Sequence, residues 1–336
     1  MTRKESADLL QKFRELKVMI IGDVMIDAYL WGDVERISPE APVPIVSVKK
    51  RAGRLGGAAN VALNIKALGA TPLLCSVIGK DDKAGTLLEL MQEMKMPTTG
   101  ILKSNDRITT TKFRVIGNNT QMLRVDEETD HPLTAEELTK FLKIIESIMS
   151  ANDINGIIFQ DYDKGVITPP LIDEVVRLAY ERKIPVAVDP KKRNFSNYKS
   201  LTLFKPNLKE LREGIGVDFN GKDIDNLRKA VRLVHNRQNI EIVLATLSAE
   251  GVYISKKTGD NSYEEHLIPA HVRSIADVSG AGDTVISTAM LCLASGLAPK
   301  EIASISNLAG GQVCESVGVV PVDPERLLNE LPAMSD

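Results

Sequence analysis

A short run near the end of the chain combines residue types that suit phosphoryl transfer. In Asp277-Val-Ser-Gly-Ala-Gly-Asp283-Thr284, two glycines precede an acidic residue, and a mostly apolar helical run, 285–295, follows. Glycines allow the backbone to approach an anion closely, and a helix that begins here directs its free N–H groups into the same space. Asp283, in the first turn, can accept a proton from a hydroxyl while the amides hold a phosphoryl group. An ordinary N-capped helix after a glycine turn explains the spacing equally well.

Residues that suit a sugar lie in the first quarter of the chain. Gly56-Gly57-Ala-Ala-Asn60 opens a helical pattern, and Asn60 can donate to and accept from sugar hydroxyls. Asp23 and Asp27 follow the first predicted strand, and the carboxyl ends of parallel strands usually face the ligand crevice. We therefore regard Gly56, Gly57, Asn60, Asp23 and Asp27 as candidates to bind a sugar. A tightly packed helix start would explain the glycine run without a ligand.

A third motif, Lys205-Pro-Asn207-Leu-Lys-Glu210, lies in the middle of the chain. Asn207 and Glu210 are three residues apart at a predicted helix start, so their side chains share one face. An amide and a carboxylate placed there could hold Mg²⁺, directly or through water. Simple helix capping by Asn207 is the alternative.

Clustered cations indicate that the substrate itself carries a phosphate, because a neutral sugar would not need so many. Arginine and lysine both bind phosphate well. The candidates are Lys191, Lys192 and Arg193, which follow Asp189 at the end of a predicted strand, with Arg114 or Arg124 as further choices from an extended segment. A solvated loop is the alternative for the first three.

Composition narrows the class of protein. The 336 residues are 43% hydrophobic and 26% charged, with a formal net charge of −3, which allows a large core and gives no indication of nucleic-acid binding. Cys75, Cys292 and Cys314 lie far apart in apolar runs, which predicts buried reduced thiols. The polar N-terminus lacks the apolar region of a secretory signal, and no run of about 18 apolar residues occurs. We expect a cytoplasmic protein that does not associate with membranes.

The elements that must position these residues alternate along the chain. Runs rich in Val and Ile, at 17–22, 156–160, 185–189 and 242–246, are separated by helical patterns. Such runs, apolar on both faces, are typical of central parallel strands. The pattern predicts one α/β domain over residues 1–336, with a doubly wound, mostly parallel sheet flanked by helices.

Two extended segments without helical periodicity interrupt this alternation, at 42–48 and 109–126. They could be edge strands of the main sheet, but both flank the first helical units, which favours a small separate β-sheet that acts as a lid over a site. We place this lid at approximately 28–50 and 107–126. An apolar outer face on it could pair with a second copy and hide its edges, so we expect a homodimer through the lid.

In combination, these motifs resemble the ribokinase, or pfkB, family of carbohydrate kinases. The resemblance rests on 56–60, on 205–210, on Gly280-Ala-Gly-Asp283 and on Ile78-Gly-Lys-Asp-Asp82-x-x-Gly85, in this order over about 17–322. The run Glu35-Arg-Ile-Ser-Pro-Glu-Ala-Pro-Val-Pro-Ile45 is similar to the subgroup of the family that phosphorylates D-glycero-β-D-manno-heptose 7-phosphate. In many relatives this kinase is fused to an adenylyltransferase that carries H-x-G-H, a pattern that none of the four histidines here forms, so we expect the stand-alone kinase.

The resemblance implies transfer of the γ-phosphoryl group of ATP to the anomeric C1 hydroxyl of the heptose 7-phosphate, a step toward ADP-heptose for lipopolysaccharide. Asp283 would be the base, and the amides of Gly280, Ala281 and Gly282 would form an anion hole. Asn207 and Glu210 would serve the ATP phosphates and Mg²⁺. Residues beside the nucleotide would be Thr246, Ser248 and Gly251, where the family's usual T-x-G is Thr246-Leu-Ser248. A monovalent cation such as K⁺ would bind Asp277 and Ser279.

Two other readings stay open at this point. Another kinase of the family, acting on fructose phosphate, ribose or a nucleoside, would share the base and the glycine turn. A non-catalytic sugar-binding regulator could retain the fold, because fold does not establish function. A dinucleotide-dependent dehydrogenase is excluded, since no G-x-G-x-x-G follows the first strand.

Overall fold

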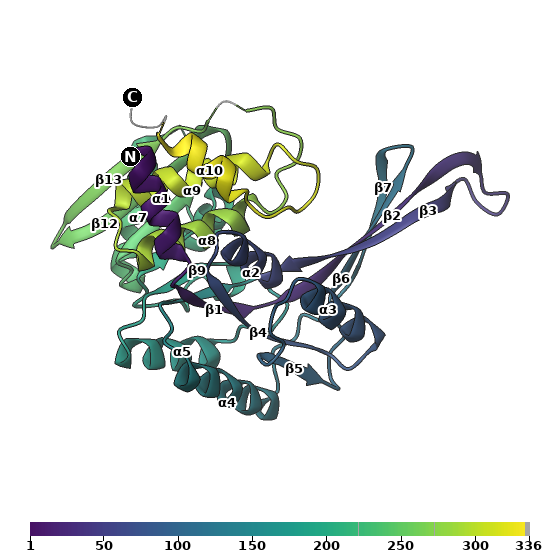
Figure 1. Cartoon of the computed structure of the whole chain (residues 1–336), viewed down its shortest axis with the longest axis horizontal. Helices are drawn as coiled ribbons and strands as arrows, with labels where there is room; N and C mark the ends of the chain where they lie inside the picture. The colour runs from purple at the N-terminus through teal and green to yellow at the C-terminus, as the bar shows by residue number, and fades with distance from the viewer. Residues whose placement is uncertain (221, 272, 333–336) are drawn as a thin grey trace.

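The main sheet of the molecule is long and mostly parallel. The structure is a computed structural model that describes residues 1–220, 222–271 and 273–332. Within these residues the sheet has nine strands, parallel from β5 through β11 and antiparallel from β11 to β13 (Figure 1). In spatial order they are β13 (Ser262–Ile268), β12 (Val252–Gly259), β11 (Ile242–Thr246), β10 (Leu203–Phe204), β9 (Val186–Asp189), β8 (Gly156–Gln160), β1 (Lys17–Gly22), β4 (Thr71–Gly79) and β5 (Ile101–Ser104).

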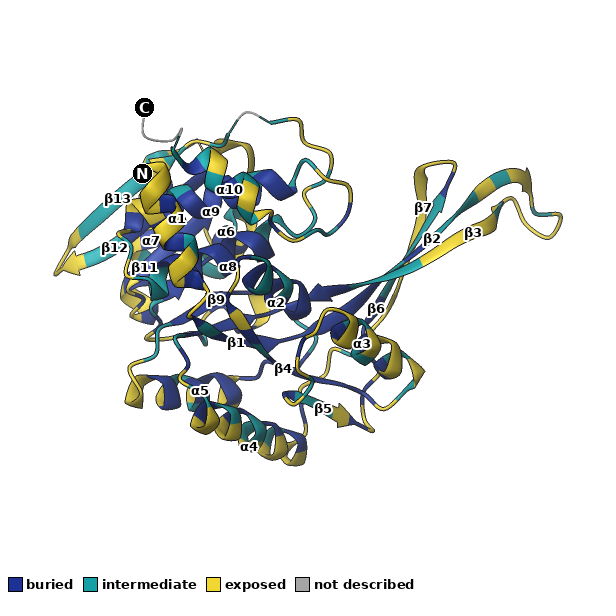
Figure 2. Ribbon diagram, in the orientation of Figure 1, coloured by how far each residue is buried: buried dark blue, intermediate teal, exposed yellow. Residues whose placement is uncertain are grey.

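Helices cover both faces of this sheet, which confirms the predicted doubly wound α/β fold. One core packs beneath α1 (Arg3–Phe13), α2 (Ala58–Ala67), α3 (Asp82–Glu93), α8 (Ala281–Ala294), α9 (Pro299–Val313) and α10 (Pro324–Glu330). The second core packs beneath α4 (Ala135–Ala151), α5 (Pro169–Glu181), α6 (Leu208–Ile215) and α7 (Ile224–Gln238). Two single turns of 3₁₀ helix, η1 (Lys192–Asn194) and η2 (Ser248–Glu250), follow β9 and β11. Figure 2 shows the central strands buried between these layers, as their apolar composition requires.

A second, smaller sheet projects from the body, on the right in Figure 1. Its order is β3-β2-β6-β7, from β2 (Val24–Ile37), β3 (Pro44–Gly57), β6 (Thr111–Gly117) and β7 (Thr120–Glu127). β2 begins two residues after β1 ends, so the chain passes directly from the centre of the main sheet into the small sheet. Residues near this junction are buried, whereas β7 is exposed along its whole length.

The remaining expectations concern cysteines and membranes. Cys75 and Cys292 are buried free thiols, as predicted. Cys314 is only partly buried, because it ends α9 where that helix borders a cavity. Among the helices of the described residues, none has the length and apolar character needed to cross a membrane.

Candidate active site

A cavity of about 690 Å³ lies where the carboxyl ends of β9 and β11 meet the first turns of α6 and α8. Strand ends and helix starts meet there because the connections of a parallel sheet place them at the same edge. The cavity brings together predicted residues from four separate motifs. They are Asp189, Lys191, Asn207, Glu210, Thr246, Ser248, Gly251, Gly280, Ala281, Gly282 and Asp283.

Asp283 is the most deeply placed acid of this cavity, with 4% of its surface exposed. Its Oδ2 accepts a hydrogen bond from Asn60 Nδ2 at 2.7 Å, and its Oδ1 accepts from the Tyr162 hydroxyl at 2.7 Å and from Gln160 Nε2 at 3.1 Å. Burial raises the pKa of Asp283 to about 6, although the hydrogen bonds from Asn60 and Tyr162 act in the opposite direction. A carboxylate with this pKa is a better proton acceptor than an exposed one and is still ionised at neutral pH.

A buried ion pair stands beside this base. Lys205 Nζ lies 3.0 Å from Asp189 Oδ2, and the lysine is 2% exposed. A Cβ added to Gly282 would lie 3.6 Å from both atoms, so the start of α8 passes close to the pair. The Asp189 carboxylate raises the pKa of Asp283, and the Lys205 ammonium lowers it. Lys205 belongs to a motif that the sequence had singled out, but its role as the cation beside the base was missed.

The start of α8 leaves backbone donors free toward the cavity. Gly280 caps the helix at φ 84°, in the left-handed region that glycine adopts without strain. Of the three amides predicted to form an anion hole, that of Ala281 donates to the Val278 carbonyl at 3.3 Å. In the part of the chain that the structure describes, the amides of Gly280 and Gly282 have no acceptor. The amides that remain available to an anion are therefore those of Gly280 and Gly282, with the Lys205 ammonium close to Gly282.

Three buried acceptors around Asp283 lack a donor among the described residues. They are Asn60 Oδ1, Gln160 Oε1 and Asp189 Oδ1. The side-chain amides of Asn60 and Gln160 donate to Asp283, and that of Gln160 also donates to Asp189. Buried polar atoms of native proteins are almost always paired, so unpaired ones at one place point to a ligand or water with hydroxyl donors. Such a set suits a polyhydroxylated acceptor.

Two of the residues that contact the base, Gln160 and Tyr162, were not predicted from the sequence. Gln160 ends β8, and Tyr162 lies in the loop that follows it. The rule that drew attention to Asp23 and Asp189, a polar residue after a parallel strand, would have found both. Burial and the Asp283 charge raise the pKa of Tyr162 well above its ordinary value, so its hydroxyl remains a proton donor to the carboxylate.

Asp23 holds this loop in place and does not face the cavity. Its carboxylate oxygens accept from the backbone N–H groups of Tyr162 at 2.9 Å, Lys164 at 3.2 Å and Val166 at 3.1 Å. Burial and the neighbouring Asp161 raise the pKa of Asp23 to about 6. These three backbone bonds give Asp23 a positioning role for the loop, and its binding of sugar hydroxyls stays a prediction.

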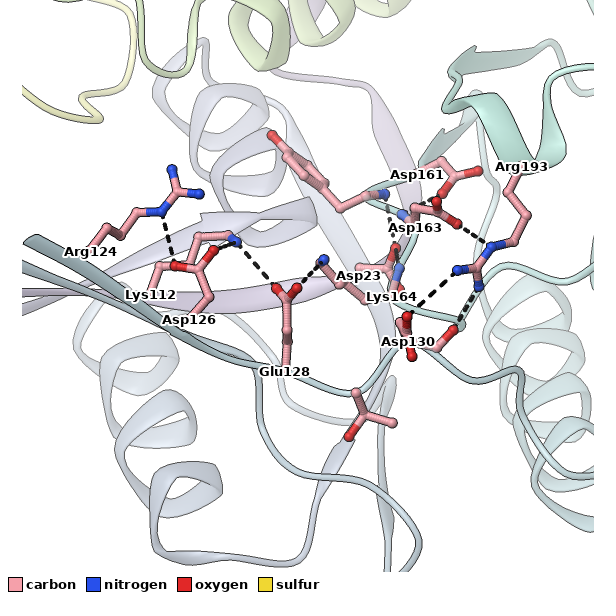
Figure 3. Close-up of polar contacts among 12 residues, drawn as sticks. Asp23, Lys112, Arg124, Asp126, Glu128, Asp130, Asp161, Asp163, Lys164 and Arg193 are labelled. Atoms are coloured by element: carbon pink, nitrogen blue, oxygen red, sulfur yellow. Dashed lines mark hydrogen bonds and ion pairs between the residues drawn. The ribbon is translucent and has the colours of Figure 1, made fainter.

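Ion pairs tie the same loop to the small sheet and to the turn after β9 (Figure 3). Glu128, just beyond β7, accepts from Lys164 at 2.7 Å and from Lys112 of β6 at 3.3 Å. Arg193 Nε lies 2.7 Å from Asp163 Oδ1, and its Nη1 donates to the Asp130 carbonyl at 2.6 Å. The structure thus uses the Arg193 guanidinium to join two loops.

Asn207 and Glu210 form the capping box that was the alternative to a metal site. Glu210 N–H donates to Asn207 Oδ1 and Asn207 N–H donates to Glu210 Oε2, both at 2.8 Å. The second oxygen of Glu210 is paired with Lys191. Burial lowers the pKa of Lys191, but the Asp189 and Glu210 carboxylates raise it more, so it is above its ordinary value. Because both Glu210 oxygens are engaged, Asn207 and Glu210 suit a hydrated Mg²⁺ held through water. The described residues contain no cluster of three or more acidic, histidine or cysteine side chains that could hold a metal directly.

The turn after β11 has a strained backbone. Ser248 adopts φ 56°, and Gly251 adopts φ 94° beside backbone atoms of 268–270. The left-handed region costs little for glycine and more for serine. This explains why a glycine is common at the position of Ser248 in the family that the sequence resembles. Thr246, Ser248 and Gly251 all line the cavity.

The other predicted residues lie outside the cavity lining. Asp27 is buried in an ion pair with Arg114, and a Cβ on Gly56 would lie 2.4 Å from Asp27 Oδ2. Gly57 caps α2 at φ 61°.

Asp277 braces the turn before α8: its Oδ1 accepts from the Ser279 N–H and hydroxyl, and its Oδ2 accepts from Gly318 N–H. The exposed side chains of Lys192 and Arg124 do not reach the cavity, and Arg124 bonds to Asp126.

Comparisons with known proteins identify the family and the fold of the chain. The sequence pattern of the pfkB family of carbohydrate kinases matches residues 15–326 of this chain. "Bifunctional protein HldE" of Pelobacter propionicus is 36% identical over 329 residues, which are 98% of this chain and 66% of the relative. The protein of the same name from Desulfatibacillum aliphaticivorans is 39% identical over 320 residues, which are 95% of this chain and 64% of the relative. The chain thus spans slightly less than two thirds of the length of these relatives.

Solved structures share the fold at low identity. Phosphofructokinase-2 from Escherichia coli, in complex with potassium, superposes with a TM-score of 0.75 at 17% identity, over 94% of this chain and 99% of that one. Ribokinase from Arabidopsis thaliana, in complex with ribose and ATP, superposes with a TM-score of 0.70 at 16% identity, over 93% of this chain and 98% of that one. These comparisons confirm the ribokinase-like fold that the sequence predicted.

The pKa of Asp283 predicts an acidic limb in the rate of phosphoryl transfer. If Asp283 accepts the proton of the acceptor it must be ionised, so kcat/KM should be flat above about pH 7 and should fall about tenfold per pH unit below the pKa of about 6. A pH series at fixed ionic strength measures this limb. The ionisable groups that face the carboxylate are Asp189, Lys205 and Tyr162.

Asp23 has the same pKa, so Asp23→Asn is the control for this series. We expect this variant to lower the rate through the misplaced loop and to keep the limb near pH 6. Disappearance of the limb in Asp23→Asn would show that the titrating group is not Asp283.

Proposed function

The chain belongs to the pfkB family of carbohydrate kinases, phosphotransferases that act on a sugar hydroxyl, and we propose that its acceptor is D-glycero-β-D-manno-heptose 7-phosphate. In this proposal ATP phosphorylates the anomeric C1 hydroxyl and the product is the 1,7-bisphosphate, an intermediate toward ADP-heptose for lipopolysaccharide. The run 35–45 and the relatives at 36–39% identity favour this acceptor over other sugars. We place the reaction in the cytoplasm.

One observation carries the assignment to a sugar hydroxyl. A buried carboxylate with a pKa of about 6 stands among three unpaired acceptors, on Asn60, Gln160 and Asp189. A carboxylate alone would suit many general bases, but three further acceptors beside it call for several donors on one small molecule. A sugar carries several adjacent hydroxyl donors.

The reaction then follows from the contacts of Asp283. As the sugar oxygen bonds to the γ-phosphorus of ATP, its proton passes to Asp283, and the bond from the γ-phosphorus to the bridging oxygen breaks to release ADP. The Gly280 and Gly282 amides and the Lys205 ammonium lie where negative charge develops on the transferring group. Asn60 and Tyr162 hold the carboxylate in the orientation that receives the proton.

ATP is assigned to the rest of the cavity. Lys191 and the first turn of α6, from Asn207 to Glu210, face the phosphates, and the turn from Thr246 to Gly251 faces the nucleoside. Mg²⁺ would neutralise the phosphates and would be held by Asn207 and Glu210 through water. We place a monovalent cation such as K⁺ at Asp277 and Ser279, beside the amides of the anion hole.

The proposed acceptor is tested by ADP release from ATP with a panel of sugars and sugar phosphates. We expect heptose 7-phosphate to give the highest kcat/KM and ³¹P NMR to place the new phosphate on C1. Fructose 6-phosphate, ribose and a nucleoside in the panel represent the other kinases of the family. A preference for any of these would reject the heptose, and binding without turnover would indicate a sugar-binding regulator.

Replacement of the base is the sharpest test of the mechanism. Asp283→Asn keeps the shape and removes the proton acceptor, so kcat should fall by about 10²–10⁴ while the affinity for ATP, from calorimetry, changes little. Asp173→Asn, on an exposed part of α5, is the matched control and should be indistinguishable from the parent. An Asp283→Asn variant with near-normal kcat would require another base.

The outer face of the small sheet supports a homodimer. Leu123 and Val125 of β7 lie on one face and are 57% and 44% exposed. Exposed apolar strands in a soluble protein usually find a partner. We expect the protein to sediment as a dimer at micromolar concentration, and the double variant Leu123→Lys, Val125→Lys to sediment as a monomer.

Tyr180→Lys is the control for this measurement, because Tyr180 is 84% exposed on α5, away from the small sheet. It should leave the dimer intact. A monomeric parent, or dissociation by both variants, would reject association through the small sheet.

A further inference from the structure

The proposed substrate carries a phosphate far from the reacting hydroxyl, so a cation must meet it. Nearly all the cations predicted for this role are neutralised by a carboxylate of the same chain. Lys191 pairs with Glu210, Arg193 with Asp163, Arg114 with Asp27, and Arg124 with Asp126. Lys192 forms no ion pair within the described residues, but its side chain is exposed to solvent.

Arg54 of β3 differs from these cations. It is half-buried at the base of the small sheet and, within the described ranges of the chain, forms no ion pair with a carboxylate. Its Nη1 donates to the Val319 carbonyl at 3.1 Å, and its guanidinium lies 5.5 Å from the centre of the Tyr29 ring. A guanidinium has five donors, so most of its hydrogen-bonding capacity remains for a ligand.

A second arginine faces the same tyrosine. The Arg114 guanidinium lies 5.3 Å from the centre of the Tyr29 ring, and Asp27 holds it there by an ion pair. In register, Arg54 lies opposite Asp27 and Arg114 lies beside Tyr29. Alternation along the strands therefore places all four side chains on one face of the small sheet. The Tyr29 ring, only 7% exposed, is a fixed surface against which both cations are oriented.

This face is adjacent to the catalytic base. Arg54 contacts Val319, and a Cβ on Gly280 would lie 3.4 Å from Val319 Cγ1 and 3.1 Å from Asn60 Nδ2. Asn60 in turn donates to Asp283. A series of contacts through Val319, Gly280 and Asn60 thus links Arg54 to the base.

We infer that Arg54, supported by Arg114 across Tyr29, binds the phosphate of the sugar substrate and sets the preference for a phosphorylated acceptor. This rests on the proposed function, in which the acceptor is a sugar phosphate. Bidentate pairing of a guanidinium with two phosphate oxygens provides the recognition. The inference moves the phosphate subsite from the loop 191–193, the first choice from the sequence, to the inner face of the small sheet, where Arg114 was a further candidate.

The test compares heptose 7-phosphate with unphosphorylated heptose. Arg54→Met should raise KM for heptose 7-phosphate about 10- to 100-fold, the loss of a charge-assisted contact, with little change in kcat or in KM for ATP. For unphosphorylated heptose, kcat/KM should be unchanged, and Arg54→Lys should recover part of the loss. Equal losses with both sugars would indicate a structural role and overturn the inference.

Two further variants sharpen this comparison. Arg51→Met, on the same strand but on the opposite face and exposed, is the matched control and should behave as the parent. Lys192→Met tests the rival subsite. A rise in KM for heptose 7-phosphate in Lys192→Met, with none in Arg54→Met, would assign the phosphate to the loop after β9 and overturn the inference.

Inorganic phosphate separates failure of the subsite from failure of the proposed function. If the parent turns over no heptose 7-phosphate, the proposed acceptor is wrong, and the subsite is then judged by ³¹P line broadening of inorganic phosphate. Saturable broadening that is lost in Arg54→Met and kept in Arg51→Met would support the subsite. Broadening that is equal in the parent and Arg54→Met, or absent from both, would reject it.

Discussion

The burial of one carboxylate, that of Asp283, is the constraint on which the rest of the site depends. A charge removed from water is unfavourable unless donors replace the lost hydration. Here the donors are Asn60 from α2, Gln160 from the end of β8 and Tyr162 from the loop beyond it. Helix α8 can therefore begin where it does only if three other parts of the fold deliver a donor to its first turn. The conformation of the Tyr162 loop depends in turn on Asp23, a second buried acid with backbone donors.

The electrostatic balance around the base sets its strength. Asp189 raises the pKa of Asp283 and Lys205 lowers it, and the two partners are themselves an ion pair with almost no exposure. Loss of Lys205 would leave two buried carboxylates near one another, which favours a shared proton and a poorer base at neutral pH. The Lys205 ammonium thus favours the ionised form of the base even when no phosphate is bound. The same ammonium is already oriented to bind a phosphate group that enters the site.

The sequence predicted some residues of this site and missed others. The strands rich in Val and Ile, the glycine turn before Asp283 and the residues around Thr246 converged as expected, because the carboxyl ends of parallel strands share one edge. The rule that marks polar residues after a parallel strand would have identified Tyr162, but not its partner, because the contact with Asp283 joins residues 121 apart. For Asn207 and Glu210 the pattern fitted both a metal site and a capping box, and only the Lys191 pair decides that both Glu210 oxygens are engaged. Charge patterns failed most clearly: they identified cations but not the carboxylates that neutralise Arg193 and Arg124.

The small sheet combines two roles because a strand alternates its side chains. One face carries Arg54, Tyr29 and Arg114 toward the base, and the other carries Leu123 and Val125 toward solvent. A slip of one residue in register would exchange the two faces, so the buried pairs at the junction with the main sheet, such as Ile26 with Leu55, must specify it. A partner that covers the apolar face would hold the cationic face over the sugar. Association and recognition of the substrate phosphate would then be coupled through a single sheet, and loss of the partner would weaken sugar binding before it weakened ATP binding.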